Sequence, residues 1–164
     1  GLKTTQIEDF KSAVQMLACF LEVLGGHFYD HIRDTARCLL PALTFRFSDD
    51  VKRDAIQAWQ DLISAANAGQ KLRQLPDDGL VTELIRGFLQ NTVQAMRAEE
   101  DLEILQVQAI GIASCIKAAG PGSMTIDEVR ELCAQVKALV DESTQRQRSA
   151  QLEEVQDEDE DAER

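Results

Sequence analysis

Apolar residues recur along this chain at intervals of three and four, the period of an amphipathic α-helix. The first run places them at Ile7, Phe10, Val14, Leu17, Leu21 and Leu24. The same period predicts five further helices, over about residues 28–47, 49–66, 80–96, 101–119 and from 125 onward. No segment shows the two-residue alternation of a half-buried strand. The pattern therefore predicts an all-α protein, and its dominant residue types (Ala, Leu, Gln, Glu and Arg) are strong helix formers.

Residues with capping chemistry stand where several predicted helices begin. Ser48 precedes the third helix and belongs to a favoured class of N-cap residue. Thr5 with Glu8, and Thr125 with Glu128, have the spacing of a capping box, in which the two residues satisfy each other's free backbone donors. These positions predict the starts of the first, third and sixth helices.

The six predicted helices pair into three hairpins, which cover about residues 5–47, 48–97 and 98–150. Ala13-Val14-Gln15 in the first hairpin corresponds to Ala55-Ile56-Gln57 in the second, 42 residues later. Two helices per unit and a period in the forties are typical of HEAT-type α-solenoids. The sequence therefore predicts about three antiparallel hairpins in a right-handed superhelical stack, each burying one face against its neighbour. An ordinary six-helix bundle is the alternative.

Acidic residues are concentrated at the end of the sequence. The eight acids of residues 153–163 are Glu153, Glu154, Asp157, Glu158, Asp159, Glu160, Asp161 and Glu163. Residues 1–150 hold 21 of the 29 acids and 16 of the 17 bases, so they carry −5 of the total charge of −12. Residues 151–164 are predicted to be disordered in isolation, because they combine dense like charge with few apolar side chains.

The eight acids are the one candidate protein-binding site, and they suit a basic partner such as a lysine-rich protein. A solvated linker without a partner is the alternative interpretation of the same residues. Nucleic acid and anionic membranes both attract a basic surface, so the negative charge argues against direct binding to either.

The four cysteines, Cys19, Cys38, Cys115 and Cys133, lie in apolar helical sequence without a CxxC motif. We expect them to be small core residues in a reducing compartment, the cytosol or the nucleus. No apolar run approaches the roughly 20 residues needed to span a bilayer, so membrane insertion is not expected.

Other candidate sites have plainer interpretations. His27 and His31 have a spacing that suits a metal, but no third ligand is fixed by the sequence. The residues from Glu99 to Asp101 form a carboxylate cluster that also suits the start of a helix. Trp59 falls on the buried stripe of the third helix, which favours core packing over recognition. No phosphate-binding loop, HExxH or GxSxG motif occurs, so we expect a non-enzymatic protein without a cofactor.

The junction between the first two hairpins has a distinctive pattern, Leu39-Leu40-x-Ala42-Leu43-x-Phe45-x-Phe47-x-Asp49-x-Val51-Lys52-x-x-Ala55. Residues 36–63 resemble the importin-β superfamily of nuclear transport receptors, and in particular the larger importins that carry ribosomal proteins and histones. The acidic run over 156–161 lies where those importins have an acidic segment after a long inner helix.

This resemblance implies a fragment of a nuclear import receptor that shuttles between cytoplasm and nucleus. Such receptors bind protein cargo and Phe-Gly nucleoporins, and they release cargo when the GTPase Ran binds in its GTP form. Cargo or Ran contacts are then expected on the second, fourth and sixth helices, and nucleoporin Phe side chains between adjacent first helices of the hairpins. A static HEAT-repeat scaffold, for example of a phosphatase, is the alternative.

Overall fold

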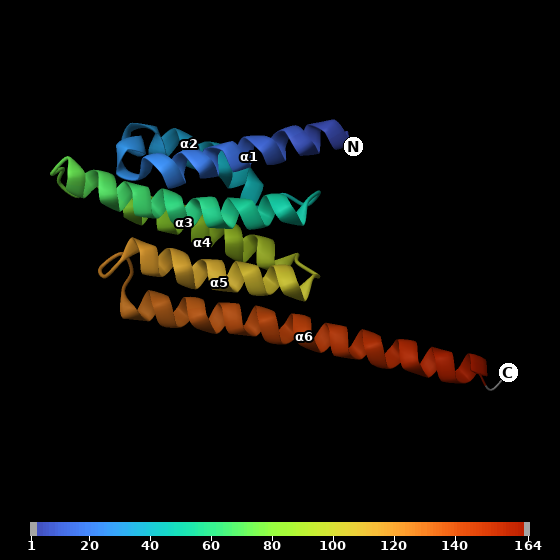
Figure 1. Cartoon of the computed structure of the whole chain (residues 1–164). Helices are drawn as coiled ribbons and strands as arrows, with labels where there is room; N and C mark the ends of the chain where they lie inside the picture. The colour runs from blue at the N-terminus through green and yellow to red at the C-terminus, as the bar shows by residue number, and fades with distance from the viewer. Residues whose placement is uncertain (1–2, 163–164) are drawn as a thin grey trace.

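The computed structural model describes residues 3–162, and their side chains as far as Glu153. Its elements are α1 (Thr4–Leu24), the 3-10 helix η1 (Gly25–His31), α2 (Ile32–Leu43), α3 (Asp49–Leu72), α4 (Leu80–Arg97), α5 (Leu102–Ala119) and α6 (Ile126–Ala162) (Figure 1). No strand occurs within this range, and the predicted all-α class is confirmed.

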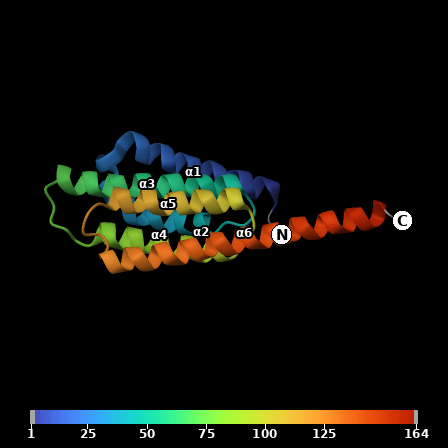
Figure 2. The same ribbon diagram turned by 90° about the horizontal axis from the view of Figure 1, so that it is seen from below.

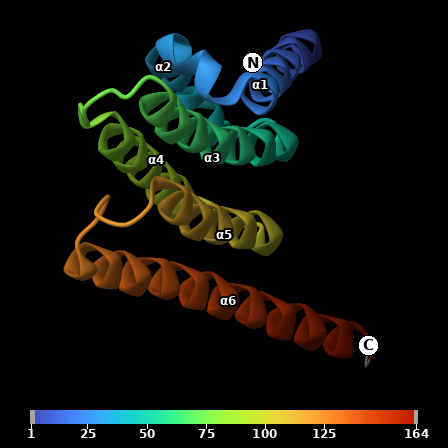
Figure 3. The same cartoon turned by 60° about the vertical axis from the view of Figure 1, so that its left-hand side comes forward.

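The helices lie in two layers. The first layer contains α1, α3 and α5, which pack side by side and run in the same direction (Figures 1 and 3). The second layer contains α2, α4 and α6, which also contact one another in chain order. Each helix of the first layer additionally packs on the second-layer helix that precedes it, α3 on α2 and α5 on α4. Every pair of helices is therefore joined to the next pair through both layers.

The predicted second helix, over 28–47, is divided in the structure. Residues 25–31 form η1, and α2 begins only at Ile32. A Cβ built on Gly26 would lie 2.8 Å from the backbone of Ala68 and Gly69, so only glycine permits this close approach of η1 to α3. At the same contact, the Tyr29 side chain of η1 packs against Gly69 of α3. Gly25 has a positive φ of 48°, so α1 ends at the Gly25-Gly26 pair, and η1 then approaches α3 closely.

The end of α2 also differs from the prediction. The helix ends at Leu43, two residues after Pro41, which supplies no backbone donor to the last turn. Phe45 therefore lies in the connection to α3, where its ring packs edge-on against Phe10 at 4.9 Å and against Phe47 at 5.6 Å. The Phe-x-Phe pair thus belongs to the junction between hairpins and not to the helix.

Two of the three predicted helix starts have the expected chemistry. The Ser48 hydroxyl accepts a hydrogen bond from the backbone N–H of Val51 at 3.4 Å. The Thr125 hydroxyl accepts from the Glu128 N–H at 3.2 Å, and the Glu128 carboxylate accepts from the Thr125 N–H at 2.7 Å. Both caps are local in sequence, which is why residue type and spacing suffice to predict them.

The predicted box of Thr5 and Glu8 is wrong. The first helix already begins at Thr4, so Thr5 lies inside it. The Gln6 side chain instead accepts a hydrogen bond from the Lys3 backbone N–H at 3.0 Å. The N-cap of α1 is therefore Lys3, two residues before the predicted Thr5.

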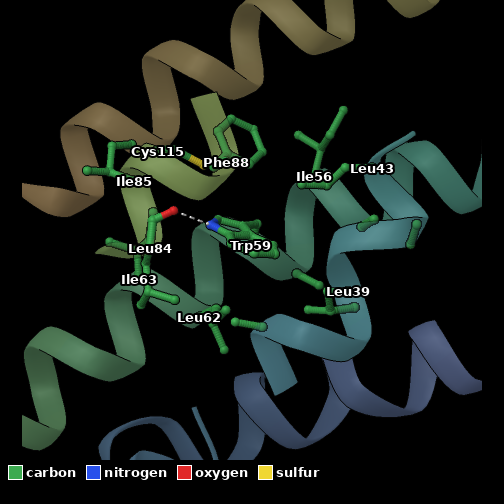
Figure 4. Packing of buried hydrophobic residues seen from close by; sticks show 14 of the residues in the cluster. Leu39, Leu43, Ile56, Trp59, Leu62, Ile63, Leu84, Ile85, Phe88 and Cys115 are labelled. Atoms are coloured by element: carbon green, nitrogen blue, oxygen red, sulfur yellow. Dashed lines mark hydrogen bonds between the residues drawn. The ribbon is translucent and has the colours of Figure 1, made fainter. Parts of the chain in front are cut away.

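The central core lies between α3, α4 and α2. Trp59 is 1% exposed, its Nε1–H donates to the Leu84 carbonyl at 3.1 Å, and its ring centroid lies 6.1 Å from that of Phe88 (Figure 4). Leu39 approaches the same cluster from α2. The prediction that Trp59 is a core residue is confirmed.

One helix in the described range, α5, has the length and hydropathy of a possible membrane span. Its 18 residues have a mean hydropathy of 1.3, so the expectation that no apolar run approaches the length of a membrane span does not hold for α5. Core helices of soluble proteins share these properties, and α5 packs between α3, α4 and α6. Length and composition are therefore weak evidence for insertion.

The last helix is the longest. Figures 1 and 2 show α6 continuing past the ends of the other helices. Gln147 of α6 still contacts the body, where its side-chain amide donates to the Glu100 carbonyl at 3.0 Å. The helix then continues to Ala162, through most of the segment for which the sequence predicts disorder in isolation. Disorder of that segment in solution stays a prediction.

Candidate protein-binding surfaces

The predicted acidic site lies on the distal part of α6. Glu153 is exposed on this helix. The backbone of the next six acids is helical, but their side chains lie outside the described residues: Glu154, Asp157, Glu158, Asp159, Glu160 and Asp161. Glu163 lies outside the described residues altogether. Seven of the eight acids therefore lie on one helix, and their role in binding stays a prediction.

The second layer carries a groove between α4 and α6, of about 490 Å³. Its walls combine apolar and amide side chains with one arginine: Leu89, Gln90, Val93, Gln94, Arg97, Leu132 and Gln135. These residues belong to two of the three helices on which the sequence places cargo or Ran contacts. The groove offers apolar surface with hydrogen-bonding groups along its edge, which suits a protein segment.

A second pocket, of about 420 Å³, adjoins this groove because Gln94 lines both. It lies where the α2–α3 and α4–α5 connections meet. Half of its ten lining residues are charged: Arg46, Asp49, Lys52, Glu99 and Glu100. The same residues include two positions of the junction pattern, Asp49 and Lys52. The two hollows, which share Gln94, are together called the α4 depression below.

Lys52 and Glu99 form a buried ion pair at the floor of this depression. The Lys52 Nζ atom lies 2.6 Å from Glu99 Oε2 and 3.0 Å from Asp49 Oδ1, and the Lys52 and Glu99 side chains are only 9% and 11% exposed. Burial pulls the pKa of Lys52 down, but the hydrogen bonds and charges of Glu99 and Asp49 outweigh it and leave the pKa raised. The ammonium therefore stays charged and ties α3 to the α4–α5 connection.

This pair was missed by sequence reasoning, which assigned the residues from Glu99 to Asp101 to the start of a helix. Asp101 does cap α5, since its carboxylate accepts from the N–H groups of Glu103 at 2.7 Å and Ile104 at 3.4 Å. Glu99 instead binds Lys52 and accepts from the N–H of Asp101 at 3.1 Å. The only sequence signal was Lys52 itself, a lysine next to the buried Val51 on an apolar stripe.

Polar bridges cross the first layer, where nucleoporin side chains were expected to enter. Between α1 and α3, Lys11 pairs with Asp50 at 2.6 Å and Gln15 donates to Asp54 at 3.0 Å. Between α3 and α5, the Asn67 amide donates to the Ala118 carbonyl at 2.8 Å. A side chain entering between these helices would have to displace such bridges or pass between them.

Ion pairs also connect η1 and α2 to later elements. Arg73 binds both carboxylate oxygens of Asp30, at 2.6 and 2.9 Å, and its guanidinium lies 5.5 Å from the centre of the Tyr29 ring. This bond lowers the pKa of Asp30. In the second layer, Arg33 lies 3.4 Å from Asp78 and so links α2 to the turn before α4. These exposed ion pairs link η1 to the end of α3 and α2 to the turn before α4.

The two histidines lie on η1 and are exposed, and the His31 ring lies 5.3 Å from that of Phe28. In the part of the chain that the structure describes, no group of three His, Cys, Asp or Glu side chains is placed to hold a metal ion. Among these residues, the structure therefore places no set of ligands around His27 and His31 that could form a metal centre.

The cysteines divide into two kinds. Cys115 is buried, and burial together with the nearby Asp61 charge raises the pKa of its thiol to about 12. Cys19, Cys38 and Cys133 are exposed, so the expectation that all four are core residues is wrong for these three. Cys19, for example, lies midway between the inward Leu17 and Leu21, on the side of the helix away from the buried stripe. No known protein-family model matches the sequence.

Proposed function

We propose that this chain is part of a nuclear import receptor of the importin-β superfamily, built from HEAT-type hairpins. In this role it binds protein cargo, Phe-Gly nucleoporins and Ran-GTP, catalyses no reaction, and shuttles between cytoplasm and nucleus. The proposal rests on the junction over residues 39–55, which resembles that of the larger importins.

The positions of the junction residues in the structure support this proposal. Leu39, Leu43, Val51 and Ala55 are each at most 2% exposed and join α2 to α3. Lys52 connects the same junction to the following hairpin through Glu99. The residues that carry the resemblance are thus those that hold consecutive hairpins together, which is what a stacking module requires.

The two-layer packing supports the HEAT-type stack in particular. The pairs α1–α2, α3–α4 and α5–α6 follow one another with like helices in contact, and each first-layer helix also packs on the preceding pair. A closed six-helix bundle would instead bring the ends of the chain into contact around one core, whereas α1 and α6 lie at opposite sides of the molecule (Figure 3). An open stack leaves long surfaces on both layers for partners.

The α4 depression is the surface on which we place cargo contact. Exposed acids at its rim, Asp49 and Glu100, suit the lysine side chains of a basic cargo. Gln90 and Gln94 offer both donors and acceptors to a bound backbone. The acidic part of α6 would then supply a second negative surface for the same cargo or for Ran.

The experiment is a pull-down with the full-length receptor that contains this chain immobilised. A lysine-rich cargo protein, Ran locked in the GTP state, and Phe-Gly nucleoporin repeats are offered separately, and cargo is then offered with Ran-GTP. We expect cargo to be retained alone and lost when Ran-GTP is added. Cargo retention that ignores Ran-GTP, without binding to Phe-Gly repeats, would leave a static HEAT scaffold as the function.

The acidic segment has its own test. Changing its eight acids to the corresponding amides should weaken binding of cargo or Ran, and added salt should weaken binding of the parent chain in the same way, because charge attraction is screened over about 8 to 10 Å. Neutralising exposed acids of α1 (Glu8, Asp9 and Glu22) serves as the control and should have little effect. Equal losses in both variants would indicate a general charge effect instead of a site.

A further inference from the structure

The distal part of α6 is attached to the rest of the molecule differently from the proximal part. In the proximal part, Val136 and Val140 line an apolar groove of about 520 Å³ between α5 and α6. Ser143 is 2% exposed and is the last buried residue of α6 among those whose side chains are described. Within the same residues, the last hydrogen bond from α6 to the body runs from the Gln147 amide to the Glu100 carbonyl at 3.0 Å. A polar contact therefore replaces apolar packing where α6 leaves the stack.

The Glu99 carboxylate holds the acceptor of this hydrogen bond in place. The Glu100 carbonyl belongs to the short α4–α5 connection, over residues 98–101. One Glu99 carboxylate oxygen accepts from the backbone N–H groups of Glu100 at 3.2 Å and Asp101 at 3.1 Å. The other oxygen accepts from the Lys52 ammonium at 2.6 Å. One side chain therefore binds both the backbone of the connection and helix α3.

These contacts form a continuous series from α3 to α6. The series starts at Lys52, passes through the Glu99 carboxylate and the backbone of Glu100, and ends at Gln147. Its hydrogen bonds measure 2.6, 3.2 and 3.0 Å. The first bond joins side chains that are 9% and 11% exposed, whereas the last is exposed to solvent. A series with a buried end and an exposed end can open at the exposed end while the helices stay folded.

We propose that the α4–α5 connection is a latch for the distal part of α6, and that Lys52 and Glu99 hold this latch closed. In the closed state, Gln147 keeps the distal part of α6 against the stack. When the Glu99 carboxylate leaves Lys52, the Glu100 carbonyl shifts and the distal part of α6 separates from the body, while the proximal part stays packed on α5.

The latch adjoins the α4 depression, because Lys52, Glu99 and Glu100 all line the pocket of about 420 Å³. A cationic group bound there competes with Lys52 for the Glu99 carboxylate. If that group is a lysine of the cargo, which rests on the proposed function, the latch couples cargo binding to the position of the acidic segment. The latch itself rests only on the contacts above.

The test is amide hydrogen exchange of this chain, measured by mass spectrometry or NMR. Gln147→Ala removes the exposed end of the latch and should speed exchange over residues 144–152 by about 2- to 10-fold, the factor that corresponds to one net hydrogen bond. Exchange over residues 126–140 should stay as in the parent. Gln145→Ala is the matched control, because Gln145 is exposed on the same turn and the change in helix propensity is identical. It should not speed exchange in either range.

The buried end of the latch needs a change that leaves no unpaired charge. Lys52→Met combined with Glu99→Leu removes both charges, so the fold should survive, as circular dichroism can verify. This double variant should speed exchange over residues 144–152 by a similar factor and leave residues 126–140 unchanged. Glu99→Gln keeps the shape of the side chain and weakens its bond to Lys52, so it serves as a second variant with a smaller effect in the same direction.

Combining Gln147→Ala with the double variant shows whether the two ends belong to one latch. One latch predicts that the triple variant exchanges no faster than the faster of its two components, whereas independent contacts predict that the two factors multiply. Multiplied factors, parent-like exchange when Lys52 and Glu99 are both replaced, or equal exchange in Gln147→Ala and Gln145→Ala would each overturn the proposal. Failure of cargo or Ran binding leaves these measurements unaffected, so the latch and the proposed function are tested separately.

Discussion

Gly111 of α5 lies so close to Ile56 of α3 that a Cβ atom on Gly111 would stand 2.4 Å from the Ile56 Cγ2 atom. No real Cβ tolerates such a contact, and Ile56 is branched at Cβ, so its methyl cannot swing away freely. The separation of the second and third hairpins in the first layer is therefore set by one glycine and one isoleucine.

Gly111→Ala should destabilise the fold by about 1 to 3 kcal/mol, because the added methyl overpacks the α3–α5 interface and outweighs the higher helix propensity of alanine. Gly87→Ala is the matched control. There the nearest atom to the new Cβ is the Trp59 ring at 3.9 Å, so alanine should stabilise by up to about 1 kcal/mol. Urea unfolding measures both. Partial rescue of Gly111→Ala by Ile56→Ala would identify the clash, and equal effects at both glycines would contradict it.

Lys52→Met should cost about 3 kcal/mol, since it leaves the Glu99 carboxylate buried without its cation. Replacing both residues, by Lys52→Met with Glu99→Leu, should return stability to within about 1 kcal/mol of the parent, because no charge then remains buried. Chemical denaturation of the single and double variants measures the coupling. Additive losses would show that the two side chains act independently.

The pH dependence of this pair follows from the raised pKa of Lys52. Its contribution is complete below the ordinary lysine value of 10.5 and is lost as the pH rises through the higher pKa of the folded state. The stability difference between the parent and Lys52→Met should therefore be constant at neutral pH and shrink in strongly alkaline solution. A difference that already shrinks between pH 7 and 9 would contradict this assignment.

Trp59→Ala should cost about 3 to 5 kcal/mol, because it empties the centre of the α3–α4 core. Trp59→Phe keeps most of the ring volume and removes the hydrogen bond to the Leu84 carbonyl, so a loss of about 1 to 3 kcal/mol is expected from that unsatisfied group and the smaller ring. Thermal melting ranks the two variants. A melting temperature of Trp59→Ala within a degree or two of the parent would mean that the tryptophan is not a core residue.

Thiol labelling of the native protein should modify three of the four cysteines and leave the fourth unmodified. Cys19, Cys38 and Cys133 are exposed and should react with a thiol reagent in the native protein near pH 8. Cys115 should react only on unfolding, because it is buried and burial raises the pKa of its thiol to about 12. Counting labels by mass spectrometry before and after denaturation checks this, and four native labels at similar rates would refute it.

The sequence predicted those features that depend on neighbours in the chain. The caps at Ser48 and Thr125 need only residues three positions away, and Trp59 lies on a stripe that its own helix defines. The helical phase of the cysteines was also available, since Cys19 falls midway between the inward Leu17 and Leu21, on the opposite side of the helix.

Other features depend on partners that are far away in the sequence, and no local pattern reports them. Glu99 meets Lys52 across 47 residues, and the α4 depression exists only where two connections converge. The close contact of η1 with α3 at Gly26 likewise joins residues about 42 positions apart, and no local pattern reports it. The groove between α5 and α6 was likewise invisible, because each helix alone shows an ordinary amphipathic stripe.

Trp59 is the only tryptophan of the chain, and its hydrogen bond to the Leu84 carbonyl holds it between the two helices of the middle hairpin. This gives the protein one fluorescent reporter at a known place. Its fluorescence reports the environment of the middle hairpin alone, whereas circular dichroism averages over every helix. Repeat stacks can lose terminal units before central ones. Superimposable unfolding curves from the two signals would mean that all three hairpins melt as one cooperative unit. If the dichroism signal falls while the Trp59 fluorescence still reports a buried side chain, the terminal hairpins unfold before the middle one.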